Sequence, residues 1–129
     1  MSWDVVLFNS SEKITSVEDI DESKLIPTDF DLVFEHSFEN IIKKANQREI
    51  KGDDFAICWF CDKEPTSNTL LNLYGENALY QLIPLAIKNN WQIFDTGSGE
   101  MIDLNNPSKN GYENFQSYLN QILNKKDLQ

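Results

Sequence analysis

The chain is poor in the residues that most metal and redox sites need. Its 129 residues include only two cysteines and one histidine. A structural zinc site takes four Cys or His ligands, so these three residues are too few to build one. A framework of several disulfides is excluded for the same reason. The sequence therefore predicts no zinc centre, and no cofactor is expected.

Long hydrophobic runs are also missing. No segment approaches the roughly 18 apolar residues that a membrane-spanning helix requires. The start Met1-Ser2-Trp3-Asp4 has no basic residue, and the apolar run Val5–Phe8 is too short for a signal peptide. We therefore expect a cytoplasmic protein that keeps its two thiols reduced.

Basic residues are scarce. The chain has 11 Lys and Arg against 21 Asp and Glu, which gives a formal net charge of −10. This charge repels both a phosphate backbone and an anionic membrane. The composition therefore disfavours nucleic-acid and membrane partners and favours a basic protein partner.

Hydrophobic residues, in contrast, are sufficient for one core. They make up 40% of the chain, and 12% of the residues are aromatic. At this length the pattern predicts one folded domain over residues 1–129. Within it, Phe55–Cys61 is the run in which neither alternate set of side chains is polar, so we expect a central strand covered on both faces.

The remaining elements follow from the spacing of apolar residues. Residues 12–27 are polar, which predicts a surface loop with a short helical turn at Ser16 to Asp19. The pattern of residues 70–74 fits either a strand or the first turns of a helix. We favour the strand, because Gly75 would interrupt a helix. The other predicted elements are strands over 3–8, 48–51 (a short edge strand), 91–95 and 101–104, and helices over 28–45, 76–90 and from Asn110 onward.

This order predicts an α+β fold. The first strands and helices match the split βαβ arrangement of ferredoxin-like domains, in which two helices lie on one face of an antiparallel sheet. Strand 101–104 would add a C-terminal hairpin strand. The last helix, with Tyr112, Phe115, Leu119, Ile122 and Leu123 on its apolar side, would cover part of the other face.

Cys58 and Cys61 have the spacing of a redox or zinc pair. A dithiol site, however, needs its first sulfur near a helix N-terminus, and here both lie on a predicted strand. Residues three apart on a strand point to opposite faces, so packing is the favoured role and redox chemistry the alternative. His36 falls on the solvated side of its predicted helix, so we expect a surface histidine more than a general base.

Three carboxylates, Asp95, Glu100 and Asp103, flank the turn Thr96-Gly97-Ser98-Gly99. Carboxylates grouped at one hairpin end can bind a hard cation or act as acid and base. They are also ordinary residues for strand ends. A small metal-dependent hydrolase built on these three residues, with or without His36, is therefore the alternative function.

The strongest remaining signal is the distribution of acids. Eight of them fall within 22 residues that contain one base, Lys24. Such a dense acidic lobe can steer a basic protein toward it, although a solvated surface that only aids solubility has the same composition. The predicted partner-binding residues are Glu18, Asp19, Asp21, Glu22, Asp29, Asp31, Glu35 and Glu39.

Three stretches carry a resemblance to known proteins: Met1-Ser2-Trp3-Asp4-Val5-Val6-Leu7-Phe8, Leu73-Tyr74-Gly75-Glu76-Asn77 and Trp91-Gln92-Ile93-Phe94-Asp95-Thr96-Gly97. They resemble a family of small acidic bacterial proteins with no assigned activity. Similar acidic single-domain proteins often serve as immunity partners of bacterial toxins, so the resemblance implies an inhibitor role. It implies no catalytic residue. A homo-oligomeric domain without a ligand is a third possibility.

Overall fold

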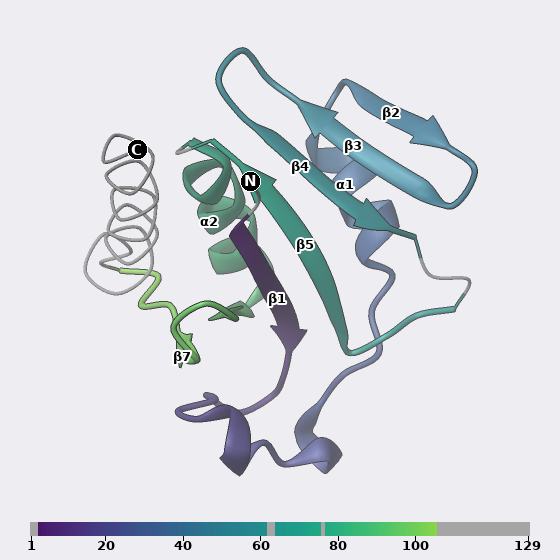
Figure 1. Cartoon of the computed structure of the whole chain (residues 1–129). Coiled ribbons are helices and arrows are strands. Elements are labelled where there is room, and N and C mark those ends of the chain that lie inside the picture. Colours follow the sequence, from purple (N-terminus) through teal and green to yellow (C-terminus); the bar gives the residue numbers. More distant parts are fainter. Residues whose placement is uncertain (1–2, 62–63, 76, 106–129) are drawn as a thin grey trace, which may run out of the picture.

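The protein is an α+β fold with a seven-stranded antiparallel sheet and two α-helices, seen in a computed structural model that describes residues 3–61, 64–75 and 77–105 (Figure 1). The sheet order is β2-β3-β4-β5-β1-β6-β7, and every neighbouring pair is antiparallel. The elements are β1 (Trp3–Asn9), η1 (Val17–Asp19), η2 (Glu22–Lys24), α1 (Phe30–Ser37), β2 (Ile41–Lys44), β3 (Gln47–Lys51), β4 (Ala56–Phe60), β5 (Asn68–Tyr74), α2 (Asn77–Asn89), β6 (Trp91–Asp95) and β7 (Glu100–Met101).

The core lies between one face of the sheet and the two helices, which both pass behind the strands in Figure 1. Alternate strand residues supply this face, because successive side chains on a strand point to opposite sides. Phe34 of α1 joins the two halves of the core: its ring centroid lies 4.7 Å from that of Trp59 and 6.1 Å from that of Trp91. We call this side of the sheet the helix face and the other side the open face.

Several predicted elements are confirmed. In β1, Trp3, Val5 and Leu7 are buried, whereas Asp4 and Val6 are only half-buried, as expected for a strand packed mostly on one side. Residues 68–74 form β5, an antiparallel partner of β4, so the strand alternative for this segment is correct. Helix α2 and strand β6 also occur where the spacing predicted them.

The prediction of one helix over 28–45 is wrong. The helix ends at Ser37, and residues 41–44 form β2, which pairs with β3. Two β-branched residues in succession, Ile41 and Ile42, fit a strand better than a helix. Ala45 then adopts a positive φ of 50°, which closes the hairpin turn. Lys43 and Lys44 therefore do not lie at a helix C-terminus.

The helix also begins at Phe30, two residues after the predicted start at residue 28. Asp29 is the N-cap, because its side chain accepts a hydrogen bond of 3.1 Å from the backbone N–H of Leu32. The Thr28 hydroxyl instead donates to the backbone oxygen of Ile26 and accepts from the Asn9 side chain. Thr and Asp are both favoured at the N-cap, and the other contacts of the Thr28 side chain explain why Asp29 caps this helix.

The expectation of a central strand covered on both faces is only half correct. β4 is third in the sheet order, and β5 occupies the middle. Ile57 and Trp59 are buried on the helix face, but Phe60 on the open face is 61% exposed. Residues 47–51 form β3, which is not an edge strand, because β2 lies outside it.

At the C-terminal end of the sheet, β7 is shorter than the predicted strand over 101–104 and contains only Glu100 and Met101. A further backbone hydrogen bond of 2.8 Å joins the N–H of Ile102 to the oxygen of Ile93. The predicted helix beginning at Asn110 lies outside the described residues. Within residues 3–61, 64–75 and 77–105, no helix has the length and apolar character needed to cross a membrane.

Candidate interaction surface

The structure divides the eight predicted acids into two groups. Glu18, Asp19, Asp21 and Glu22 lie on or beside η1 and η2, the two short turns near the end of β1 (Figure 1). Asp29, Asp31, Glu35 and Glu39 lie on or beside α1, behind the β3–β4 side of the sheet. The predicted acidic lobe is therefore two neighbouring surfaces with different surroundings.

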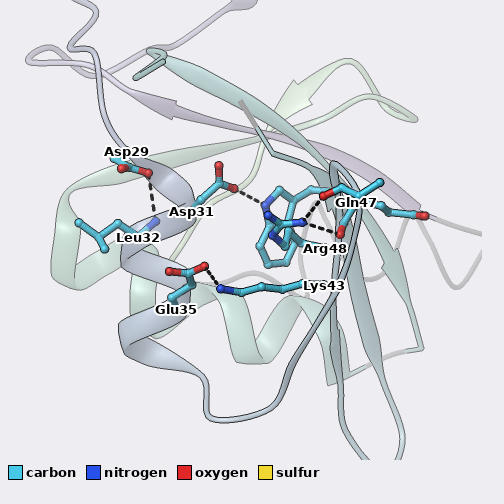
Figure 2. A network of polar contacts seen from close by, with 9 residues as sticks. Asp29, Asp31, Leu32, Glu35, Lys43, Gln47 and Arg48 are labelled. Atoms are coloured by element: carbon cyan, nitrogen blue, oxygen red, sulfur yellow. Dashed lines mark hydrogen bonds and ion pairs between the residues drawn. The ribbon is translucent and has the colours of Figure 1, made fainter. Parts of the chain in front are cut away.

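Acids of the α1 group are mostly engaged in local structure (Figure 2). Asp29 caps the helix, and Asp31 accepts a 2.5 Å hydrogen bond from the indole N–H of Trp59. Glu35 forms an ion pair of 2.6 Å with Nζ of Lys43 on β2. Asp31 and Glu35 attach α1 to the sheet, and all three carboxylates are less available to a partner.

The hydrogen bond from Lys43, together with its positive charge, holds the pKa of Glu35 below its ordinary value. The hairpin that supplies Lys43 is itself basic, with Lys44, Arg48 and Lys51 against Glu49. Arg48 donates from Nη1 to the backbone oxygens of Ala45 and Gln47, at 2.9 Å each. Of these cations, Lys43 and Arg48 lie on the helix face, and the charges of both lower the pKa of Glu35.

The group on η1 and η2 differs. Asp21 is the N-cap of η2, and its Oδ1 accepts from the backbone N–H and the hydroxyl of Ser23, which lowers the pKa of Asp21. Glu18, Asp19 and Glu22 are exposed, and their carboxylates make no hydrogen bond or ion pair with any residue that the structure describes. We call these three residues the η acidic surface.

Asp95, the first residue of the alternative site, is a structural anchor. It is 2% exposed, and Oδ1 accepts from the indole N–H of Trp3 at 2.8 Å and from the backbone N–H of Gly97 at 2.9 Å. Oδ2 accepts from the hydroxyl of Ser98 at 2.9 Å. A carboxylate that already has three donors has little capacity left for a cation or a substrate.

The other members of that site do not join Asp95. Glu100 and Asp103 are exposed, and Oδ1 of Asp103 accepts from the backbone N–H of Asn105. His36 is exposed in the last turn of α1, as the sequence predicted for a surface histidine. In the part of the chain that the structure describes, no group of three His, Cys, Asp or Glu side chains is arranged to hold a metal ion.

The structure contains an open groove that the sequence patterns did not predict. It has a volume of about 1140 Å³ and lies where residues 9–15, the end of α2, the start of β6 and residues 101–105 meet. Asp103 lines it, but Asp95 and Glu100 do not. Its wall is fixed by Gln92, whose side chain accepts from the N–H of Ile14 at 2.7 Å and donates to the oxygen of Glu12 at 2.9 Å. No local motif marks these segments, because the fold brings them together.

The two cysteines are free thiols. Cys58 lies on the open face, and its Sγ is 3.7 Å from Oε2 of Glu49. Partial burial, followed by the nearby negative charge, raises the pKa of the Cys58 thiol above its ordinary value near 9. Both effects disfavour the thiolate, which is the form that redox and nucleophilic chemistry requires.

We therefore predict that Cys58 reacts slowly with iodoacetamide near neutral pH. In the Cys61→Ser variant, the rate should rise with a midpoint above pH 9.0, the ordinary value for a thiol. Because the folded pKa is the higher one, the stability linked to the protonated thiol is complete below the unfolded pKa and is lost as pH rises through the folded pKa. A midpoint below 9 would contradict this assignment.

No family model, curated protein or solved structure matches the chain.

Proposed function

We propose that the protein is a non-enzymatic acidic binding protein, an immunity-type inhibitor of a bacterial toxin, which docks through the η acidic surface on a basic partner. The observation that carries this proposal is that Glu18, Asp19 and Glu22 are exposed and have no partner among the described residues. Carboxylates without internal partners keep their full charge available for an incoming cationic surface.

The distribution of charge supports this choice of surface. Residues 16–39 contain eight acids and one base, so they carry −7 of the total −10. Residues 43–51 contain four bases and one acid, a net charge of +3. A basic partner is therefore repelled by the β2–β3 hairpin and attracted to the other end of the acidic stretch, where the η acidic surface lies.

Backbone contacts hold this surface in place. The N–H of Ser11 donates to the oxygen of Lys24 at 2.8 Å, and the N–H of Ile26 donates to the oxygen of Asn9 at 2.8 Å. An antiparallel bridge also links Ser10 and Leu25. A docking surface that is already ordered loses little conformational entropy when a partner binds.

We also propose that the scaffold of this surface is a ferredoxin-like unit of β1, α1, β4, β5, α2 and β6. Its support is the strand order β4-β5-β1-β6 with antiparallel pairing throughout, and two helices packed into one core on the same face. The β2–β3 hairpin and β7 are then additions at the two edges.

The test is a binding titration between this chain and the product of the gene next to its own. We expect a complex whose Kd rises as salt is increased from 50 to 300 mM, because exposed charges more than about 10 Å apart are screened at 0.1 M salt. The triple variant Glu18→Gln, Asp19→Asn, Glu22→Gln should weaken binding about tenfold or more, from three lost charges each contributing up to about 1 kcal/mol.

A matched control removes the same charge elsewhere. Asp53, Glu64 and Glu100 are exposed, so Asp53→Asn, Glu64→Gln, Glu100→Gln changes the net charge equally without altering the η acidic surface. Equal loss of affinity in the two triple variants would show that only net charge matters. Absence of a complex at 50 mM salt would overturn the proposal.

A further inference from the structure

The open face of the sheet carries a row of apolar side chains that crosses several strands. Val6 on β1 is paired with Leu70 on β5 and with Phe94 on β6, and Phe94 is paired with Met101 on β7. Directly opposite residues of antiparallel strands lie on the same side of a sheet, so these four side chains form one row. Phe60 faces the same side from β4, two residues beyond the last paired position of the β4–β5 ladder, Cys58↔Asn72.

Two apolar side chains of the open face are poorly covered in the part of the chain that the structure describes. Phe60 is 61% exposed and Leu70 is 52% exposed. Ile42 and Tyr74, also on the open face, are 42% and 40% exposed. Exposed apolar side chains gathered on one face of a sheet indicate a contact surface for another element or molecule.

A second row, parallel to the first, is polar and acidic. It runs from Glu49 on β3 through Cys58 and Asn72 to Asp4 on β1. Nδ2 of Asn72 donates to Oδ1 of Asp4 at 2.7 Å. An occupant of the open face therefore needs an apolar stripe with cations beside it.

We propose that the C-terminal segment 110–126 of this same chain occupies the open face as an amphipathic helix. Its sequence pattern supplies both requirements: an apolar stripe (Tyr112, Phe115, Leu119, Ile122 and Leu123) and the two cations Lys125 and Lys126. The apolar stripe packs on the row from Phe60 to Met101. The two lysines reach the acidic row at Glu49.

The length of this segment fits the distance it must cover. The chain leaves the sheet after β7, directly beside Phe94, and the description ends at Asn105. A helix of residues 110–126 is about 25 Å long at 1.5 Å per residue. The five strand spacings from β7 to β3 add up to about 24 Å at 4.8 Å each. A helix that starts near β7 can therefore place Lys125 and Lys126 beside Glu49 on β3.

A second copy of the chain fits this face less well. In a symmetric dimer the same patch contributes from both copies, so Asp4 and Glu49 of both would lie in one interface. Like charges brought together there are destabilising. The C-terminal segment carries the opposite charge at Lys125 and Lys126, so it fits the open face better than a second copy does.

The first test needs no substitution. Zero-length carbodiimide coupling joins a lysine amine to a carboxylate that it contacts, and mass spectrometry identifies the pair. In the full chain we expect intramolecular links from Lys125 or Lys126 to Glu49. Three results would overturn the proposal. The first is the absence of these links, and the second is links only to acids off the open face, such as Glu18 and Glu100. The third is links only between copies, together with a dimer in light scattering.

The second test uses Cys58 as a reporter of the open face, in the full chain with Cys61→Ser. Leu119→Asp, Ile122→Asp introduces two charges into the apolar stripe. It should raise the rate of Cys58 labelling about tenfold, the factor that corresponds to about 1.4 kcal/mol of docking free energy. Ser117→Asp, Gln121→Asp adds the same charge on the opposite side of the predicted helix and should leave the rate unchanged. Equal rates in the two variants would overturn the proposal.

Discussion

Replacing Phe34 with Ala should lower the free energy of unfolding by about 4 kcal/mol, the middle of the range for a buried Phe→Ala change. Phe34 is fully buried and its ring packs against Trp59 of β4 and Trp91 of β6. Its removal leaves a cavity between α1 and both halves of the sheet. Urea unfolding followed by tryptophan fluorescence measures the change directly, because two of the three tryptophans line this cavity.

The matched control is Leu32→Ala in the same helix. Leu32 is 48% exposed, so its truncation should cost well under half as much as Phe34→Ala. A loss of less than about 1.5 kcal/mol for Phe34→Ala would mean that the core closes around the missing ring. In that case α1 would be less tightly fixed to the sheet than the packing indicates.

Replacing Asp95 with Ala should lower the free energy of unfolding by about 3 kcal/mol, because it leaves buried donors without an acceptor. The indole N–H of Trp3, the N–H of Gly97 and the hydroxyl of Ser98 all donate to this carboxylate. β1 and the β6–β7 turn would both lose their shared anchor. Thermal unfolding followed by circular dichroism provides the measurement.

Two further variants separate the contact from the charge. Asp95→Asn keeps one acceptor oxygen in place of two and should retain part of the stability. Glu100→Ala removes the exposed residue paired with Asp95 on β7 and should change stability by less than about 0.5 kcal/mol. If Asp95→Ala were as stable as the wild type, Asp95 would not be a structural anchor. Its carboxylate would then again be a candidate for cation binding or acid–base chemistry.

Local patterns predicted four elements. β1, β5, α2 and β6 were predictable because their buried residues recur at the strand or helix period, although β1 and β5 alternate only partly. The boundary of α1 was not, because Phe38 and Ile41 continue the helical spacing although both pack on the core from outside the helix. Helical spacing alone does not distinguish a longer helix from a helix followed by a strand.

The candidate surface was predictable in composition but not in detail. The sequence shows eight acids close together, and nothing local reveals that Asp31 bonds to Trp59 or that Glu35 pairs with Lys43. Those contacts depend on the β2–β3 hairpin folding back beside α1. Likewise, Asp95 resembles a site residue in sequence, and only its contact with Trp3, 92 positions earlier, shows its structural role.

The position of β2 at the edge of the described sheet bears on how the protein behaves when concentrated. An edge strand exposes unpaired backbone groups, which other molecules can extend into a larger sheet. Lys43 and Lys44 lie on this edge next to the exposed Ile42. Strand addition by a second molecule would bring these lysines close to their own copies, and the repulsion opposes stacking. Because the charge of Lys43 is paired with Glu35, we expect Lys44 to supply most of this repulsion and to disfavour the growth of a larger sheet from this edge.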